Sequence, residues 1–279
     1  MTIKGVLKKY RDIEIELLLA HVLGKSKEFL YMRPEYLLSK LQYTSVLKLV
    51  KRRKREEPMA YILGYKDFYG LRFKVNRNVL IPRPETEELV EMVAEQVKGQ
   101  QSKAKILDLG TGSGCIIISL AKALAPRGTL AARNGSPCYK FFASDISEKA
   151  LSVAKKNARL HDVKIKFVRS DLFYALPGKF DVIVANLPYV QKKDYVSEIK
   201  NLEWEPRLAL TDQSNHWRIY KRFFRGVAKI LNRKSLIFLE IDPKSKNMID
   251  KWRKRELPNA KIKFIKDLSG LWRFVAISS

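Results

Sequence analysis

The sequence predicts an α/β protein in which a parallel sheet of seven strands, covered by helices on both faces, follows a small helical domain. From about residue 103, short apolar strands alternate with helices, which is the pattern of a parallel sheet. The preceding residues show helical spacing and then an alternating segment typical of a β-hairpin. We therefore expect a helical domain over residues 1–63, a hairpin linker over 64–84 and an α/β domain over 85–279.

The first domain predicts a small bundle of helices. The apolar side chains that recur at helical spacing are Ile13, Leu17 and Ala20. Gly24 ends this helix, and Pro34 begins another near residues 35–41. A later helix continues into the basic run 51–55, which we expect to be a solvated helix face. Contact of this run with ribosomal RNA or an acidic partner is the alternative.

The next segment predicts a hairpin and then the start of a helix. Residues 68–75 alternate in hydrophobicity as a strand does, and a second apolar run, residues 79–81, follows the polar residues 76–78. Thr86 comes after two prolines and before two glutamates, so it is the expected N-cap of a helix.

The α/β domain predicts seven strands and the helices between them. The expected strands are residues 105–109, 139–144, 164–168, 180–185, 235–241, 261–266 and 272–277. The expected helices are residues 115–124, 147–160, 217–231 and 244–255. Residues 125–138 contain two prolines and two glycines, and we expect a surface loop without a chemical role there.

Composition narrows the class of protein. The chain has 279 residues, of which 46% are hydrophobic and 30% charged, a globular balance. No apolar run reaches the roughly 18–20 residues of a membrane span, and the start of the chain has no signal-peptide core. Cys115 and Cys138 are too few for a disulfide scaffold, and His21, His161 and His216 are too scattered for a metal site. We expect a cytoplasmic protein without membrane contact.

The charge is strongly positive and is spread along the chain. Fifty-five Lys and Arg stand against 29 Asp and Glu, which gives a formal net charge of +26. Such a surface favours nucleic acid, ribosomes or an acidic protein as partner. A lysine-rich proteome is the alternative explanation, so the charge alone does not decide the function.

A glycine-rich loop after the first strand of the α/β domain predicts a nucleoside site. Its residues are Gly110, Thr111, Gly112, Ser113 and Gly114. Glycines let the backbone approach a ligand closely, but the spacing G-x-G-x-G differs from that of dinucleotide folds, and no P-loop lysine follows. Asp145, at the end of the second strand, can accept hydrogen bonds from both hydroxyls of a ribose. Together these features indicate S-adenosylmethionine; a tight structural turn is the alternative for the loop alone.

Asp171 and Leu172 follow the third strand at the same edge of the predicted sheet. The carboxylate of Asp171 can reach the amino group of an adenine there, and the side chain of Leu172 can pack on the base. Helix capping by Asp171 is the alternative.

The fourth strand ends in Asn186, Leu187, Pro188 and Tyr189, a loop that suits a planar NH₂ group as methyl acceptor. The side-chain oxygen of Asn186 and the backbone carbonyl of Leu187 can each accept one N–H and so aim the nitrogen for in-line displacement. Tyr189 can stack on the acceptor, and Pro188 holds Leu187 extended. A simple turn after a strand is the alternative.

These motifs resemble the protein-(glutamine-N5) methyltransferases that modify the Gly-Gly-Gln loop of peptide-chain release factors. The resemblance covers nearly the whole chain, and its most specific stretch runs from Glu57 to Glu87, with the blocks Glu-Pro-Met-Ala-Tyr-Ile-Leu-Gly and Ile-Pro-Arg-Pro-Glu-Thr-Glu. The glycine-rich loop, the segment that begins at Asp145, Glu205 with the proline after it, and residues 267–270 also match.

The resemblance implies a seven-stranded, mostly parallel Rossmann-like methyltransferase sheet with a reversed last strand, a helical N-terminal domain and a connecting hairpin. It implies that residues 110–114, Asp145, Asp171, Leu172 and Asn186 contact S-adenosylmethionine, and that residues 186–189 hold the glutamine amide. The partner is then a release factor, recognised largely by the helical domain because the acceptor loop can hold only one side chain. We expect a monomer with at most a weak contact to nucleic acid or the ribosome through its basic surface.

Three departures from the family concern the substrate side. Leu187 stands where the family usually has a proline, residues 211–217 replace a glycine-rich stretch, and Asp242 and Pro243 stand where the family often has Gly and Gln. The alternatives are therefore methylation of a ribosomal-protein glutamine, methylation of an adenine or cytosine amino group, or a binding module that keeps the fold without catalysis. The positive charge favours nucleic acid, and the block from Glu57 to Glu87 disfavours it.

Overall fold

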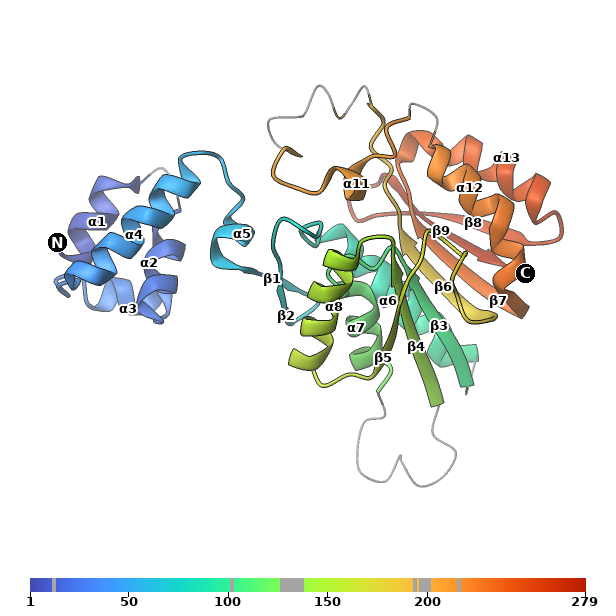
Figure 1. Cartoon of the computed structure of the whole chain (residues 1–279), viewed down its shortest axis with the longest axis horizontal. Helices are drawn as coiled ribbons and strands as arrows, with labels where there is room; N and C mark the ends of the chain where they lie inside the picture. The colour runs from blue at the N-terminus through green and yellow to red at the C-terminus, as the bar shows by residue number, and fades with distance from the viewer. Residues whose placement is uncertain (12–13, 101–102, 126–137, 193–194, 196–201, 215–216) are drawn as a thin grey trace. The chain divides into compact units, whose positions relative to one another are not determined.

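The computed structural model describes residues 1–11, 14–100, 103–125, 138–192, 195, 202–214 and 217–279, which form two compact units (Figure 1). One unit is Met1–Tyr65 and the other is Lys66–Ser279. Residues 126–137 of the predicted surface loop lie outside the described residues, as does His216. Among the helices described, none has the length and apolar character that crossing a membrane requires.

The first unit is helical. The helices described in it are α1 (Ile3–Lys9), α2 (Ile15–Leu23), α3 (Lys27–Met32), α4 (Lys40–Arg53) and α5 (Met59–Leu63). Their apolar faces share one core, in which the side chains of Leu18, Leu19, Leu30 and Val46 are fully buried. This core needs no residue of the second unit, because every member lies before Tyr65.

The helix expected at residues 35–41 is wrong. The backbone there runs alongside the start of the chain instead, and the N–H of Ile3 donates to the carbonyl of Tyr36 at 3.1 Å. Helix α4 begins one residue after Ser39 because the Ser39 hydroxyl accepts from the N–H of Gln42, while the Gln42 side chain accepts from the N–H of Ser39. This reciprocal capping box fixes the start of the helix.

The basic run 51–55 is only partly a solvated helix face. The guanidinium of Arg52 donates to both carboxylate oxygens of the buried Glu57, at 2.9 and 2.8 Å. Arg53 donates to Glu14 at 2.9 Å. Two of the positive charges are therefore paired within the helical unit rather than offered to a partner, which corrects the expectation for this run.

The second unit is built on a seven-stranded sheet (Figure 1). Its strands are β3 (Lys103–Leu109), β4 (Cys138–Asp145), β5 (Ile165–Arg169), β6 (Phe180–Asn186), β7 (Leu231–Glu240), β8 (Lys261–Lys266) and β9 (Trp272–Ser278). They lie in the order β5-β4-β3-β6-β7-β9-β8, and β9 is antiparallel to both neighbours while the pairs from β5 to β7 are parallel. The predicted sheet with its reversed last strand is confirmed.

Helices cover both faces of this sheet. The helices α6 (Glu85–Gln100), α7 (Cys115–Ala123) and α8 (Glu148–Leu160) pack on one face, and α12 (Arg218–Val227) and α13 (Lys246–Glu256) pack on the other. Strand residues alternate between the two cores as the pleat requires: Ile106 and Val182 face the first, and Leu107 and Ile183 face the second.

The helix expected over residues 217–231 is too long. Helix α12 ends at Val227, one turn of 3-10 helix follows, and β7 begins at Leu231 rather than at residue 235. Leu231 pairs with Phe180 at the start of β6, so pairing with the sheet replaces the helix at this point. The apolar residues there suit either element, which is why their spacing alone misplaced the boundary.

The hairpin exists, but with different strands from those expected. It consists of β1 (Tyr65–Phe68) and β2 (Leu71–Lys74). The turn is Tyr69 and Gly70, whose φ angles of 51° and 69° match the left-handed conformation that two-residue hairpins require. The alternating segment 68–75 therefore contains the turn, and residues 79–81 form no strand. Asn157 of α8 secures the hairpin because it accepts from the N–H and donates to the carbonyl of Lys74.

Candidate active site

A cavity of about 460 Å³ lies at the carboxyl ends of β3, β4 and β6. The predicted site residues that line it are Gly110, Gly112, Asp145, Asp171, Leu172, Asn186, Leu187 and Pro188. The predicted residues that do not line it are Thr111, Ser113, Gly114 and Tyr189. Segments far apart in the sequence meet here because the carboxyl ends of neighbouring parallel strands share one edge of the sheet.

The glycine-rich loop has a conformation that only glycine adopts easily. The φ angles of Gly110, Gly112 and Gly114 are 78°, 56° and 81°. At Gly114 an added Cβ would also lie 3.2 Å from the Cβ of Ala154, so this glycine allows α7 and α8 to pack closely. The hydroxyl of Thr111 donates to Asp108 at 2.7 Å, inside the loop. Gly110 and Gly112 thus form part of the cavity wall. Thr111, Ser113 and Gly114 shape the turn.

Asp145 joins the glycine-rich loop to the following helix. Its Oδ2 accepts from the N–H of Gly112 and its Oδ1 from the N–H of Ser147, both at 2.9 Å. Burial raises the pKa of Asp145, and these N–H donors oppose the rise. Each carboxylate oxygen can accept more than one hydrogen bond. A carboxylate held in this way beside the cavity suits a ligand with hydroxyl groups.

Asp171 and Leu172 form the next part of the wall. The guanidinium of Arg222, on α12, donates to Asp171 at 2.7 Å and also lines the cavity. Leu172 has a φ of 50°, a left-handed conformation that is unfavourable for a leucine. Sequence reasoning missed Arg222, since it lies fifty-one residues after Asp171 on a helix that shows no motif.

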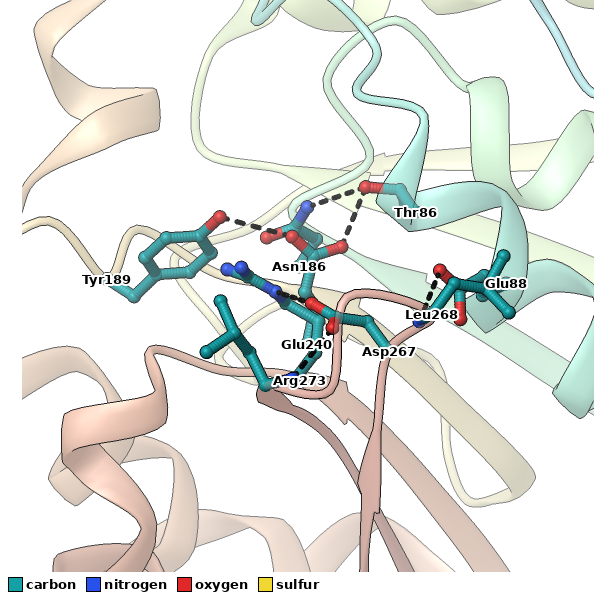
Figure 2. A network of polar contacts seen from close by, with 9 residues as sticks. Thr86, Glu88, Asn186, Tyr189, Glu240, Asp267, Leu268 and Arg273 are labelled. Carbon is teal, nitrogen blue, oxygen red and sulfur yellow. Dashed lines mark hydrogen bonds and ion pairs between the residues drawn. The ribbon is translucent and has the colours of Figure 1, made fainter.

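Asn186 lies at the end of β6 and lines the cavity (Figure 2). Its Nδ2 donates to the hydroxyl of Thr86 at 3.3 Å. Thr86 is not the N-cap of α6, because the helix begins one residue earlier, at Glu85. Its hydroxyl instead donates to the carboxylate of Glu240 at 2.7 Å.

The side chains of Leu187 and Tyr189 are held by different contacts. The side chain of Leu187 is 3% exposed and packs in the core on the α12 face, so the residue that departs from the family is accommodated there. The hydroxyl of Tyr189 donates to Glu240 at 3.1 Å. Burial and the charge of Glu240 raise the pKa of Tyr189. Tyr189 therefore holds the loop in place, and stacking on an acceptor stays a prediction.

Two further buried acids were not predicted to be site residues. Burial raises the pKa of Asp108 to about 7, and its Oδ1 has no hydrogen-bond partner among the residues described. Glu205 accepts from the N–H of Ile81 at 2.9 Å and pairs with Arg83, so it joins the segment before α6 to the chain that follows Glu205. Both segments line the cavity. The match of Glu205 and the proline after it to the family was the available sign for this residue.

The other two departures form polar turns, and the first of them lies at the cavity. Asp212 lines the cavity and accepts from the N–H groups of Ser214 and Ile219, at 2.9 and 2.7 Å. Asp242 accepts from the N–H of Lys244 at 2.8 Å and so begins a 3-10 turn. One polar turn thus stands where the family has a glycine-rich stretch, and the other stands where it often has Gly and Gln. Among the described residues, His, Cys, Asp and Glu nowhere gather in a group of three that could hold a metal ion.

The residues of the cavity fit a nucleoside with a short chain. Gly110 and Gly112 have no side chain, so their backbone is accessible on one wall of the cavity. The carboxylate of Asp145 offers hydrogen-bond acceptors to a ribose. Arg222 and Asp171 present charged groups at the same cavity. A volume of this size lies in the usual range for cofactor sites. Asn186 and Leu187 line the same cavity, so the predicted acceptor loop lies beside any ligand bound there.

The fold is that of the class I methyltransferases. A methyltransferase of Pyrococcus furiosus has a TM-score of 0.50 at 17% identity, with coverage of 82% of this chain and 97% of that one. A 16S rRNA methyltransferase of T. thermophilus, solved with AdoMet and guanosine, also has a TM-score of 0.50, at 16% identity, with coverage of 77% and 49%. Residues 100–263 match the methyltransferase domain family, and residues 8–64 match the PrmC N-terminal domain family.

Sequence relatives narrow this class to one family. A protein of Flavobacterium psychrophilum is 38% identical over 256 residues, which cover 89% of this chain and 85% of the relative. A protein of Leptospira interrogans is 37% identical over 273 residues, covering 95% and 90%. Both are named release factor glutamine methyltransferase. The chain belongs to the release factor glutamine methyltransferase family.

Proposed function

We propose that this chain transfers the methyl group of S-adenosylmethionine to the side-chain amide nitrogen of the glutamine in the Gly-Gly-Gln motif of peptide-chain release factors. The observation that carries the proposal is the meeting of Asn186, Leu187 and Pro188 with Gly110 and Asp145 at one cavity. The family to which the chain belongs supports the choice of glutamine over a nucleic-acid amino group.

In this proposal the cavity holds the cofactor, which supplies an electrophilic methyl group on its sulfonium. The loop from Gly110 through Thr111, Gly112 and Ser113 to Gly114 approaches it with bare backbone. Asp145 accepts hydrogen bonds from the ribose hydroxyls. Asp171 and Leu172 hold the adenine. The product is S-adenosylhomocysteine, and the reaction uses no metal.

The acceptor loop orients the glutamine. An amide nitrogen is a poor nucleophile because its lone pair is shared with the carbonyl. The side-chain oxygen of Asn186 and the backbone carbonyl of Leu187 accept its two N–H groups, which turns the nitrogen toward the methyl group. The nitrogen gains the methyl group and gives one of its two hydrogens to water. Pro188 keeps the Leu187 carbonyl in place, and Tyr189 fixes the end of the loop.

The helical unit is proposed to recognise the release factor. Four apolar side chains on and after α3 are strongly exposed: Tyr31 at 61%, Met32 at 77%, Leu37 at 71% and Leu41 at 82%. Contiguous patches of exposed apolar side chains are typical of protein-binding surfaces, and we propose that these four form one. We further propose that the protein acts as a monomer in the cytoplasm, away from membranes, and that its charge of +26 adds at most a weak contact with nucleic acid or the ribosome.

The test is methyl transfer from cofactor labelled in its methyl group. Three substrates are offered in parallel: a purified release factor, the same factor with the Gly-Gly-Gln glutamine changed to alanine, and bulk RNA. We expect label in the unchanged factor only. Label in the alanine variant places the methyl group elsewhere, and label in RNA supports the nucleic-acid alternative; either result overturns the proposal.

A further inference from the structure

A buried carboxylate lies directly behind the acceptor loop. Glu240 ends β7, pairs in the sheet with Asn186 on β6, and is 1% exposed. Its Oε2 accepts from the hydroxyl of Thr86 at 2.7 Å, and its Oε1 accepts from the hydroxyl of Tyr189 at 3.1 Å (Figure 2). Glu240 and Thr86 do not line the cavity, so neither is placed to touch a substrate there.

These contacts fix which way the amide of Asn186 faces. A hydroxyl has one hydrogen, and that of Thr86 is donated to Glu240, so toward Asn186 the Thr86 oxygen can only accept. It accepts from Nδ2 of Asn186 at 3.3 Å. The nitrogen and oxygen of an asparagine amide lie on opposite sides, so anchoring the nitrogen at Thr86 turns the oxygen away from Thr86. Methyl transfer needs that oxygen as an acceptor for the glutamine N–H.

The same glutamate also braces the rest of the loop. Its side chain holds the hydroxyl of Tyr189. Its backbone carbonyl accepts from the hydroxyl of Tyr220 at 2.6 Å, and that hydroxyl also lies 3.4 Å from the carbonyl of Leu187. One residue thus contacts, directly or through one neighbour, three members of the acceptor loop.

We propose that Glu240 and Thr86 are positioning residues for methyl transfer, because Glu240 takes the hydroxyl hydrogen of Thr86 and thereby sets the orientation of the Asn186 amide. This inference rests on the proposed function. The competing explanation is that the pair only ties α6 to the sheet. If that were the only role, removing the hydroxyl at position 86 would change stability or folding. It would leave the rate of the chemical step unchanged.

The test uses Thr86→Val, which keeps the shape and removes the hydroxyl. We expect kcat with a release-factor substrate to fall about 10- to 100-fold, the scale of losing a group that orients a catalytic residue. The Kd of the cofactor is expected to stay within about twofold, because Thr86 lines no part of the cavity. Thr86→Ser is expected to restore most of the rate, because it returns the hydroxyl. Ser235→Ala is the matched control, since it removes a buried hydroxyl in the middle of β7, away from Glu240 at the end of the strand.

A second variant guards against a folding defect in the first. In Glu240→Gln the amide presents a donor to either Thr86 or Tyr189, where the carboxylate presents acceptors to both. We expect the same loss of kcat with little change in cofactor Kd.

Equal kcat in Thr86→Val and parent, or no recovery in Thr86→Ser, overturns the inference. Asn186→Ala is measured beside them: if it is slow while Thr86→Val is not, the proposed function stands and only the inference fails. If Asn186→Ala is also as fast as the parent, both fail.

Discussion

At the scale of single residues, Asp145 can hold the glycine-rich loop and accept hydrogen bonds from a ligand at the same time. It holds the glycine-rich loop through Gly112 and leaves acceptor capacity beside the cavity. We expect Asp145→Ala to weaken S-adenosylmethionine binding by about 1–3 kcal/mol, the cost of lost hydrogen bonds to a buried partner. Calorimetry measures this, with the exposed Asp67→Ala as control. Equal affinity of the Asp145 variant and the parent would remove this carboxylate from the site.

Asp108 makes the stability of the second unit depend on pH. In the unfolded chain an aspartate ionises near pH 4, whereas burial keeps Asp108 protonated up to about pH 7. Between these values the folded protein binds the extra proton, so the free energy of unfolding falls as the pH rises, by up to about 1.4 kcal/mol per pH unit.

Asp108→Asn should flatten that decline, because an asparagine does not ionise. Urea unfolding at pH 5, 6 and 7 without cofactor measures it, and Asp67→Asn serves as the exposed control. If the free energy of unfolding falls with pH equally steeply in the parent and in Asp108→Asn, another group must be titrating.

At the scale of elements, the contact between α7 and α8 depends on one glycine. A Cβ at Gly114 would lie 3.0 Å from Cδ1 of Ile118 and 3.2 Å from the Cβ of Ala154. Gly178 has a similar φ, 87° against 81°, but nothing lies within 4 Å of its Cβ position. Gly114→Ala should therefore lower the free energy of unfolding by about 1–3 kcal/mol more than Gly178→Ala, since only it adds overpacking to the backbone strain. Urea denaturation of the two variants compares them, and equal losses would refute close packing as the reason for Gly114.

The strands that form the cavity could be predicted, because short apolar runs ended in Gly110, Asp145 and Asn186 at one edge of a parallel sheet. The hairpin was misplaced because its two-residue turn lies inside an alternating run, where Tyr69 takes a left-handed conformation that no turn motif announces. The link between Thr86 and Glu240 could not be predicted, because 154 residues separate them and only the folded sheet brings them together. Local patterns reveal elements and motifs, whereas contacts between distant polar side chains depend on the complete packing.

At the scale of the whole molecule, we propose that the helical unit recognises the release factor while the second unit carries out the methyl transfer. Met32 and Leu41 are the most exposed apolar side chains of the helical unit. Changing both to serine should raise the KM for the full-length release factor about tenfold, the scale of losing interface contacts, without changing the Kd of the cofactor. Leu160→Ser, at a half-exposed leucine of α8, is the control. An unchanged KM in the double variant would move recognition away from this surface.

The central claim is that Asn186 holds the glutamine nitrogen during methyl transfer. Single-turnover methylation of a release factor by Asn186→Ala, at saturating cofactor, tests it most directly because product release does not enter the rate. We predict a rate about 10²–10³ below that of the parent, the scale of losing one preorganised catalytic hydrogen bond. A rate within about threefold of the parent, far short of that loss, would contradict the account and place the acceptor elsewhere.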